Sequence, residues 1–125
     1  MEDFNLIIKD LISKDLDSLK LEIPESLKME FEKTADNYIK NGNLLEAIKV
    51  FVITKNKQRL IQTANLCLKE NKPYDALCGF YYSEDVESLN KVGFILLQIP
   101  DVESAFKAFK KANNREMIDF LKTNF

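Results

Sequence analysis

The side chains in this sequence that could do chemistry are concentrated in one short stretch, DALCGFYYSED, at residues 75–85. Cys78 could act as a nucleophile, and the neighbouring Tyr81 and Tyr82 could stack on a base or a peptide. Nucleophilic catalysis by cysteine requires a base that takes up the thiol proton. The chain contains no histidine, which is the commonest such base. We therefore expect that the protein is not an enzyme.

A metal or cofactor site is also not indicated. The other cysteine, Cys67, and Cys78 do not form the CxxC pattern typical of zinc ligands, and histidine is absent as a ligand. No glycine-rich phosphate loop is present either. We predict no metal and no cofactor, a buried structural role for Cys67, and an exposed Cys78.

Composition favours a helical, water-soluble domain. The 125 residues are 46% hydrophobic and 30% charged, with only three glycines and three prolines. This is typical of a globular protein and low in the turn residues that a β-fold needs. The net charge of −2 indicates no general attraction to nucleic acid. With no visible signal peptide, no long apolar run and only two cysteines, we expect no membrane span and a cytoplasmic location.

A repeat of 29 residues organises most of the chain. Moving the sequence against itself aligns residues 28–56, 57–85 and 86–114 without a gap. Two columns are identical in all three units, namely Ala47, Ala76 and Ala105, and Phe51, Phe80 and Phe109. Other columns conserve size: Phe31, Leu60 and Leu89 are large, whereas Ala35, Ala64 and Gly93 are small. A repeated unit of this length buries its apolar surface by stacking on its neighbours.

Each unit reads as two helices, because apolar and small residues recur at steps of three and four. The break inside each unit carries Gly42, Pro73, or Pro100 with Asp101, which are helix stop and start signals. Asn43 and Glu46 have the spacing of a capping box. Residues able to cap the next helix close the three units: Asn56, Asp85 and Asn114.

The two ends are predicted to be caps. An amphipathic helix near the N-terminus would bury one face, formed by Phe4, Ile7, Ile8, Leu11 and Ile12. A short turn would begin at Ser13 or Asp15, and Pro24 would start the next helix. At the C-terminus, a lone helix would turn inward Met117, Ile118 and Leu121. We predict an all-α solenoid of three antiparallel helix pairs in a single domain, 1–125, with a cap at 1–23, repeats at 24–56, 57–85 and 86–114, and a C-terminal capping helix at 115–125.

These columns resemble the tetratricopeptide repeat over residues 24–125. The first unit matches the spacings of that family best, through Phe31, Ala35, Tyr38, Ala47 and Phe51, with Gly42 at the turn. Cys67 and Leu96 stand in the aromatic position of the later units. The period is about five residues shorter than that of the family and the closing proline is missing. The shorter unit is similar to the α-solenoids of vesicle-coat, clathrin and intraflagellar-transport proteins.

Either resemblance implies a right-handed solenoid that acts as a protein-interaction scaffold and binds a peptide or partner helix in its concave groove. In the tetratricopeptide family, the first helix of each pair lines this groove. The residues of this chain that would face the groove are Glu32, Asp36, Lys40, Ile61, Asn65, Lys69, Asn90, Phe94 and Gln98. Phe94 could be an exposed anchor beside Ile61, or it could pack on a neighbouring helix. The family's clamp for an acidic C-terminus is disfavoured, because only Asn65 matches it.

Two alternatives remain open. A basic cluster near Tyr81 and Tyr82 could bind RNA or another single-stranded nucleic acid, and consists of Lys55, Lys57, Arg59, Lys69 and Lys72. The negative net charge argues against this alternative. The open ends of a solenoid could instead pair, which would make the protein a homo-oligomer with a structural role.

Overall fold

The computed structural model describes residues 2–18 and 21–125, apart from the side chains of residues 2–5 and 18. Across these described residues the chain is all-α, as predicted, with eight α-helices and one short 3-10 helix. In chain order the elements are α1 (Glu2–Ile12), η1 (Leu16–Ser18), α2 (Glu25–Lys40), α3 (Leu44–Thr54), α4 (Lys57–Lys69), α5 (Pro73–Ser83), α6 (Val86–Gln98), α7 (Val102–Lys111) and α8 (Arg115–Asn124).

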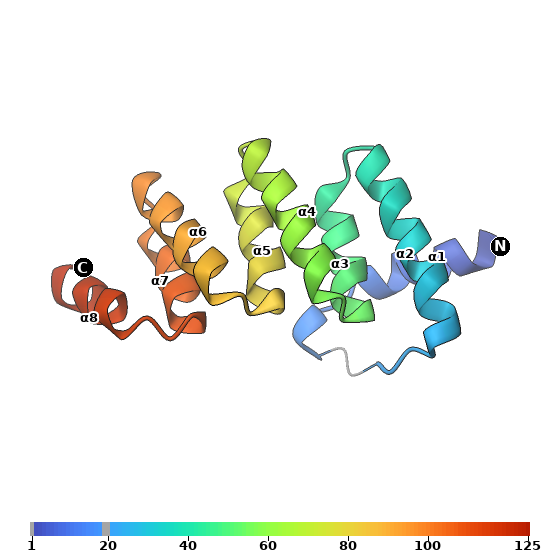
Figure 1. Ribbon diagram of the computed structural model, residues 1–125, viewed down its shortest axis with the longest axis horizontal. Helices are drawn as coiled ribbons and strands as arrows, with labels where there is room; N and C mark the ends of the chain where they lie inside the picture. The colour runs from blue at the N-terminus through green and yellow to red at the C-terminus, as the bar shows by residue number, and fades with distance from the viewer. Residues whose placement is uncertain (1, 19–20) are drawn as a thin grey trace.

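The helices from α2 onwards follow one another along the long axis of the molecule (Figure 1). The helices α2, α4 and α6 pack on α3, α5 and α7 respectively, and α8 packs on α7. The helix α3 also contacts α5, and α5 contacts α7, whereas α1 and η1 lie against α3. We call the surface of α2, α4 and α6 the first-helix face, and the surface of α3, α5 and α7 the second-helix face.

The core is built from the repeated columns. The alanines and phenylalanines that are identical in the three units are all completely buried, and they are Ala47, Ala76, Ala105, Phe51, Phe80 and Phe109. Leu60, Leu89 and Leu96 are also buried in the same continuous cluster. Burial of each large apolar side chain stabilises the fold by roughly 1.5–3 kcal/mol. The apolar period in the sequence therefore marks the side chains that hold the helices together.

Small residues set the distance between paired helices. A Cβ atom added at Gly79 in α5 would lie 2.8 Å from Cβ of Ala64 in α4. A Cβ atom added at Gly93 in α6 would lie 2.7 Å from Cζ of Phe109 in α7. Both distances are below any normal contact. Ala64 and Gly93 of the small-residue column therefore lie at the interfaces of α4 with α5 and of α6 with α7, as the sequence pattern indicated.

The junctions between units are capped by the predicted residues. The side chains of Asn56, Asp85 and Asn114 each accept a hydrogen bond from the backbone N–H three residues later, at 3.1 Å. Asp101 caps α7 in the same way, with a bond of 3.0 Å from Ser104. These bonds satisfy donors that the first turn of a helix leaves unpaired.

The predicted capping box at Asn43 is not formed. The Asn43 side chain accepts no capping hydrogen bond at the start of α3. Its backbone N–H donates instead to the Tyr38 carbonyl at 2.8 Å, as part of the C-terminal turn of α2. Gly42 makes this turn possible with a φ angle of 78°. In a capping box the Glu46 side chain would accept a hydrogen bond from the backbone N–H of Asn43, but that N–H already donates to Tyr38.

The N-terminal helix buries a narrower face than the sequence suggested. Ile8 and Ile12 are buried and Leu11 is half-buried, but Ile7 is 53% exposed, which corrects its predicted inward position. A helix packed against α3 at one edge can turn only one stripe inward. The predicted contribution of Phe4 to this face lies outside the described side chains.

The short turn near the N-terminus and the helix near the C-terminus occur where they were predicted. Asp15 precedes η1 and accepts a hydrogen bond from the Asp17 backbone N–H at 3.1 Å, so a short turn does start there. In α8, Leu121 is buried, and Met117 and Ile118 are half-buried against the core. The helix α8 thus packs its apolar side chains on α7.

Candidate functional site

The two thiols are poorly suited to catalysis. Cys67 is fully buried, and burial raises the pKa of its thiol to about 11. Cys78 is half-buried rather than exposed, which corrects the prediction, and burial raises its pKa as well. Its short apolar side chain lies against the core, in a position that lysines occupy in the other two units. Both thiols therefore stay protonated, and weakly nucleophilic, near neutral pH.

Three of the predicted groove residues are engaged in contacts between successive helices of the first-helix face. Asn56 Nδ2, at the start of α4, donates a hydrogen bond of 2.9 Å to Glu32 in α2. Arg59 pairs with Asp36 at 2.6 Å. Asn114 Nδ2, at the start of α8, donates to Asn90 in α6 at 2.9 Å. These groove candidates thus connect helices across the junctions between units.

The other predicted groove residues divide into two groups. Ile61 is half-buried and packs against the core. The polar members are exposed, and no hydrogen bond or ion pair joins them to another described side chain; they are Lys40, Asn65, Lys69 and Gln98. The structure brings no predicted groove residue into contact with a second one through a hydrogen bond or ion pair within residues 2–18 and 21–125.

Phe94 combines the two alternatives considered for it. Its side chain is 48% exposed, yet its ring packs edge-on against Phe109, with the ring centroids 5.0 Å apart. The buried Phe109 ring fixes the base of Phe94, whereas the remaining half of the side chain faces water. A rigid, half-exposed aromatic side chain can bind a partner without losing much conformational freedom.

The basic cluster near the two tyrosines is largely neutralised. Lys55 pairs with Glu22, and Lys57 pairs with Glu84, at 2.8 and 3.0 Å. Arg59 is held by Asp36, and Lys72 lies 3.7 Å from Glu70. Only Lys69 of this cluster has no ion pair among the described residues. The predicted basic patch therefore presents little excess positive charge.

Tyr81 and Tyr82 make contacts in opposite directions along the second-helix face. The Lys107 and Lys111 ammonium groups of α7 lie 5.0 and 4.6 Å from the centre of the Tyr81 ring. The Tyr82 hydroxyl donates a hydrogen bond of 2.6 Å to Asp17 in η1. The two rings touch edge-on at 5.3 Å. Tyr81 therefore binds the next unit, whereas Tyr82 binds the N-terminal segment.

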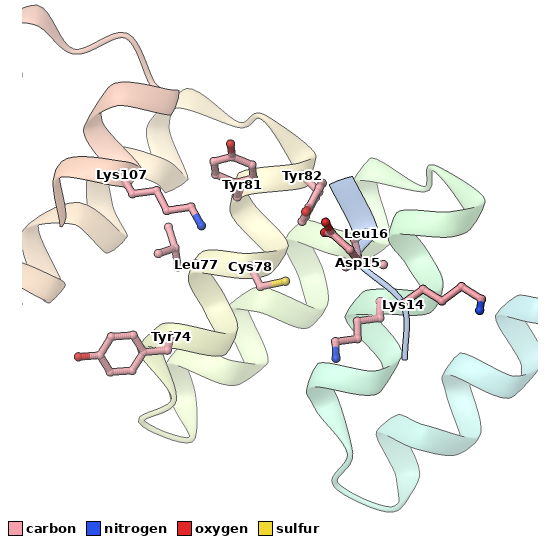
Figure 2. A pocket seen from close by; sticks show the side chains of 10 residues that line it. Lys14, Asp15, Leu16, Tyr74, Leu77, Cys78, Tyr81, Tyr82 and Lys107 are labelled. Carbon is pink, nitrogen blue, oxygen red and sulfur yellow. The ribbon is translucent and has the colours of Figure 1, made fainter. Parts of the chain in front are cut away.

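A hollow that sequence reasoning missed lies on the second-helix face (Figure 2). It has a volume of about 290 Å³ and is bounded by α3, α5, α7 and residues 14–16. Its lining side chains are Lys14, Asp15, Leu16, Lys49, Tyr74, Leu77, Cys78, Tyr81, Tyr82 and Lys107. Figure 2 shows Lys107 reaching from α7 towards α5, and Asp15 and Leu16 approaching from the other side. One signal was present in the sequence, because Lys49, Cys78 and Lys107 occupy equivalent positions in the three units.

The charged side chains that line this hollow are mostly basic. Three lysines, Lys14, Lys49 and Lys107, line it together with one carboxylate, Asp15. Lys14 lies 3.6 Å from Asp10, whereas Lys49 and Lys107 form no ion pair among the described residues. The Tyr74 hydroxyl donates to Asp101 at 2.9 Å, so it points away from the hollow centre and towards α7. The hollow thus offers positive charge beside tyrosine rings.

Neither metal binding nor a membrane span is indicated within the described part of the chain. No group of three or more His, Cys, Asp or Glu side chains in that part could hold a metal ion. No helix within it combines the length and hydrophobicity needed to cross a bilayer. In comparisons with protein-family models, with curated proteins and with solved structures, no match was found.

Proposed function

We propose that this protein is a non-catalytic interaction adaptor, built as a right-handed α-solenoid of three antiparallel helix pairs with a capping helix at each end. The packing of α2 on α3, α4 on α5 and α6 on α7 supports this architecture, as do the contacts of α3 with α5 and of α5 with α7. The compact period of 29 residues supports a tetratricopeptide-like solenoid. The lack of histidine and the two protonated thiols support a role without catalysis.

The observation that carries the proposal is the geometry of Phe94. This ring is 48% exposed and is held edge-on by the buried Phe109 ring. Large aromatic side chains fixed in this way are typical energetic centres of protein interfaces. Gln98 lies one helical turn further along α6 and is exposed, so it could form hydrogen bonds at the rim of the same contact. We propose that a peptide or partner helix docks here on the first-helix face.

Site-specific photo-crosslinking tests this proposal. A photoreactive amino acid at Gln98 should capture a protein partner from lysate, and the same group at the exposed Lys9 in α1 should not capture that partner. Mass spectrometry identifies the partner, whose affinity for the purified protein is then measured. Phe94→Ala should weaken that binding at least about tenfold.

The matched control is Phe120→Ala in α8, because Phe120 is 49% exposed and lies outside the first-helix face. It should leave the affinity for the partner unchanged. Equal losses in the two variants, or capture of RNA in place of protein at Gln98, would overturn the proposal. Unfolding curves of both variants verify that each is folded.

Self-association is a second candidate, favoured by the apolar C-terminal end. A hollow of about 420 Å³ lies between α7 and α8 and is lined mainly by Val102, Phe106, Leu121 and Phe125. Phe125 is 76% exposed there. Sedimentation velocity over a range of concentrations tests this candidate. A dimer that Phe125→Ser converts to a monomer would support it, and a monomer at every concentration would exclude it.

A further inference from the structure

The second-helix face already binds one acidic segment, and that segment belongs to the chain itself. Asp17 accepts a hydrogen bond of 2.6 Å from the Tyr82 hydroxyl. Leu16 lies beside Val52 and Ile53 of α3, and these side chains line a small hollow together with Leu21 and Lys55. The sequence Asp15-Leu16-Asp17 thus places an apolar side chain on one second helix and a carboxylate on the next.

The repeat places a similar surface one unit further along. Tyr81 and Tyr82 in α5 occupy the positions that Val52 and Ile53 occupy in α3. The helix α7 also contacts α5, although less extensively than α5 contacts α3. No described segment of the chain lies over this second position. Beside Tyr81 lies a further hollow of about 370 Å³, lined by three lysines of α7: Lys107, Lys110 and Lys111.

The charge at this position is unbalanced. Lys111 lies 3.7 Å from Glu84, which already pairs with Lys57 at 3.0 Å. Lys107 and Lys110 are exposed and form no ion pair among the described residues. Two ammonium groups also converge on the Tyr81 ring, at 5.0 and 4.6 Å from its centre. Lysines so close together repel one another, and an added carboxylate would relieve this repulsion.

We propose that the α5–α7 part of the second-helix face binds an acidic segment of a partner protein, whose carboxylates pair with Lys107 and Lys110. The segment Asp15-Leu16-Asp17 is an acidic stretch of this chain that already lies on the same face, although the residue that corresponds to Tyr82 one unit later is Lys111. The site lies on α5 and α7, whereas Phe94 lies in α6. This inference therefore does not rest on the proposed function.

The structure favours an acidic peptide over nucleic acid at this surface. Single-stranded nucleic acids bind by stacking bases on open aromatic faces. Here two lysine side chains of α7 lie over Tyr81, and Tyr82 covers its edge. Tyr82 itself is held by Asp17. The positive charge is accessible to carboxylates, whereas the rings are not open for stacking.

Fluorescence anisotropy with the full chain tests the proposal. The probe is a fluorescein-labelled peptide with two Asp-Leu-Asp segments, and the control probe replaces each Asp by Asn. We expect the acidic probe to bind more tightly, and its binding to weaken when salt rises from about 50 to about 200 mM. The double variant Lys107→Gln/Lys110→Gln should weaken binding by about fivefold or more.

A matched control removes two exposed lysines from the first-helix face. The variant Lys69→Gln/Lys91→Gln has the same net charge as Lys107→Gln/Lys110→Gln. It should bind the acidic probe as tightly as the wild type does. Phe94→Ala should also leave this affinity unchanged, which separates this site from the one proposed for Phe94. Four results would each overturn the inference: no measurable binding, equal binding of both probes, equal losses in the two lysine pairs, or tighter binding of oligouridylate through Lys107 and Lys110.

Discussion

The Tyr82 hydroxyl donates a hydrogen bond of 2.6 Å to Oδ1 of Asp17, although the two residues stand 65 positions apart. This bond fastens η1 to α5, while Leu16 beside it lies on α3. The N-terminal segment is therefore bound to two successive second helices. It also forms one wall of the basic hollow on that face.

Replacing Tyr82 by Phe should loosen this segment. The variant keeps the ring but loses the hydrogen bond, so we expect the free energy of unfolding to fall by about 1 kcal/mol. Limited proteolysis should cleave residues 14–18 faster than in the wild type. Denaturant unfolding measures the first effect and a cleavage time course the second. An unchanged cleavage rate would show that Leu16 alone holds the segment.

The same hydrogen bond predicts a dependence on pH. Burial, and then the bond to Asp17, raise the pKa of Tyr82 above its ordinary value. The folded protein therefore holds this proton more tightly than the unfolded chain does. Tyrosines in an unfolded chain ionise at about pH 10. The stabilisation is present below that pH and is lost as the pH rises towards the folded pKa. The free energy of unfolding should thus fall more steeply at alkaline pH in the wild type than in Tyr82→Phe.

The buried phenylalanine column should dominate stability. Phe80 is completely buried in the middle unit, so Phe80→Ala removes a large side chain with packed neighbours on all sides. We expect a loss of roughly 3–5 kcal/mol in the free energy of unfolding. The control is Phe120→Ala at a half-exposed position, where the loss should stay below about 1 kcal/mol. Similar thermal melts for both variants would contradict the role assigned to this column.

The contact of Gly79 with Ala64 predicts a compensating pair. Gly79→Ala places a methyl group 2.8 Å from Cβ of Ala64 and 3.2 Å from the Leu60 carbonyl oxygen. We expect a loss of about 1–3 kcal/mol from overpacking. Adding Ala64→Gly removes the closer of the two contacts and should restore part of this stability. A double-mutant cycle by chemical denaturation measures the coupling, and strict additivity would refute the close approach.

Asn56 and Asn114 each donate a side-chain hydrogen bond to an earlier helix, to Glu32 and Asn90 respectively. Replacing each of them by Asp should change the stability of the protein differently. In Asn56→Asp the cap of α4 survives, but the new carboxylate meets the carboxylate of Glu32. In Asn114→Asp the cap of α8 survives and the new carboxylate meets Asn90, whose amide can rotate to donate. At neutral pH we expect Asn56→Asp to be the less stable variant, by about 1 kcal/mol.

The difference between these two variants should shrink in acid, because protonated carboxylic acids do not repel one another. Thermal melts at neutral and acidic pH measure this change. A constant difference at both pH values would mean that the repulsion between residues 32 and 56 does not cause it.

Local patterns in the sequence were sufficient to predict the helices and their breaks. Phe51, Phe80 and Phe109 recur at one period, and each is buried. The spacing of residues along a helix decides which side chains share a face, so the buried face could be predicted from the sequence. Asn56, Asp85 and Asn114 were predictable as caps because a capping bond joins residues only three positions apart. Asn43 was mispredicted because a turn from the preceding helix competes for its backbone N–H.

The candidate sites depended on contacts that no local pattern encodes. The spacing of Glu32, Asp36 and Asn90 predicted a shared face, but not that side chains at the starts of α4 and α8 would engage them. The half-exposed state of Phe94 depends on the ring of Phe109 in the next helix.

The sequence by itself therefore determined the helical repeat, since periodicity and capping act over a few residues. Only the tertiary structure decided where the N-terminal segment lies, and with it the shape of the basic hollow. The bond from Tyr82 to Asp17 spans 65 positions. Such a contact forms only after helix packing has set the distance between the two side chains, so it leaves no periodic trace in the chain.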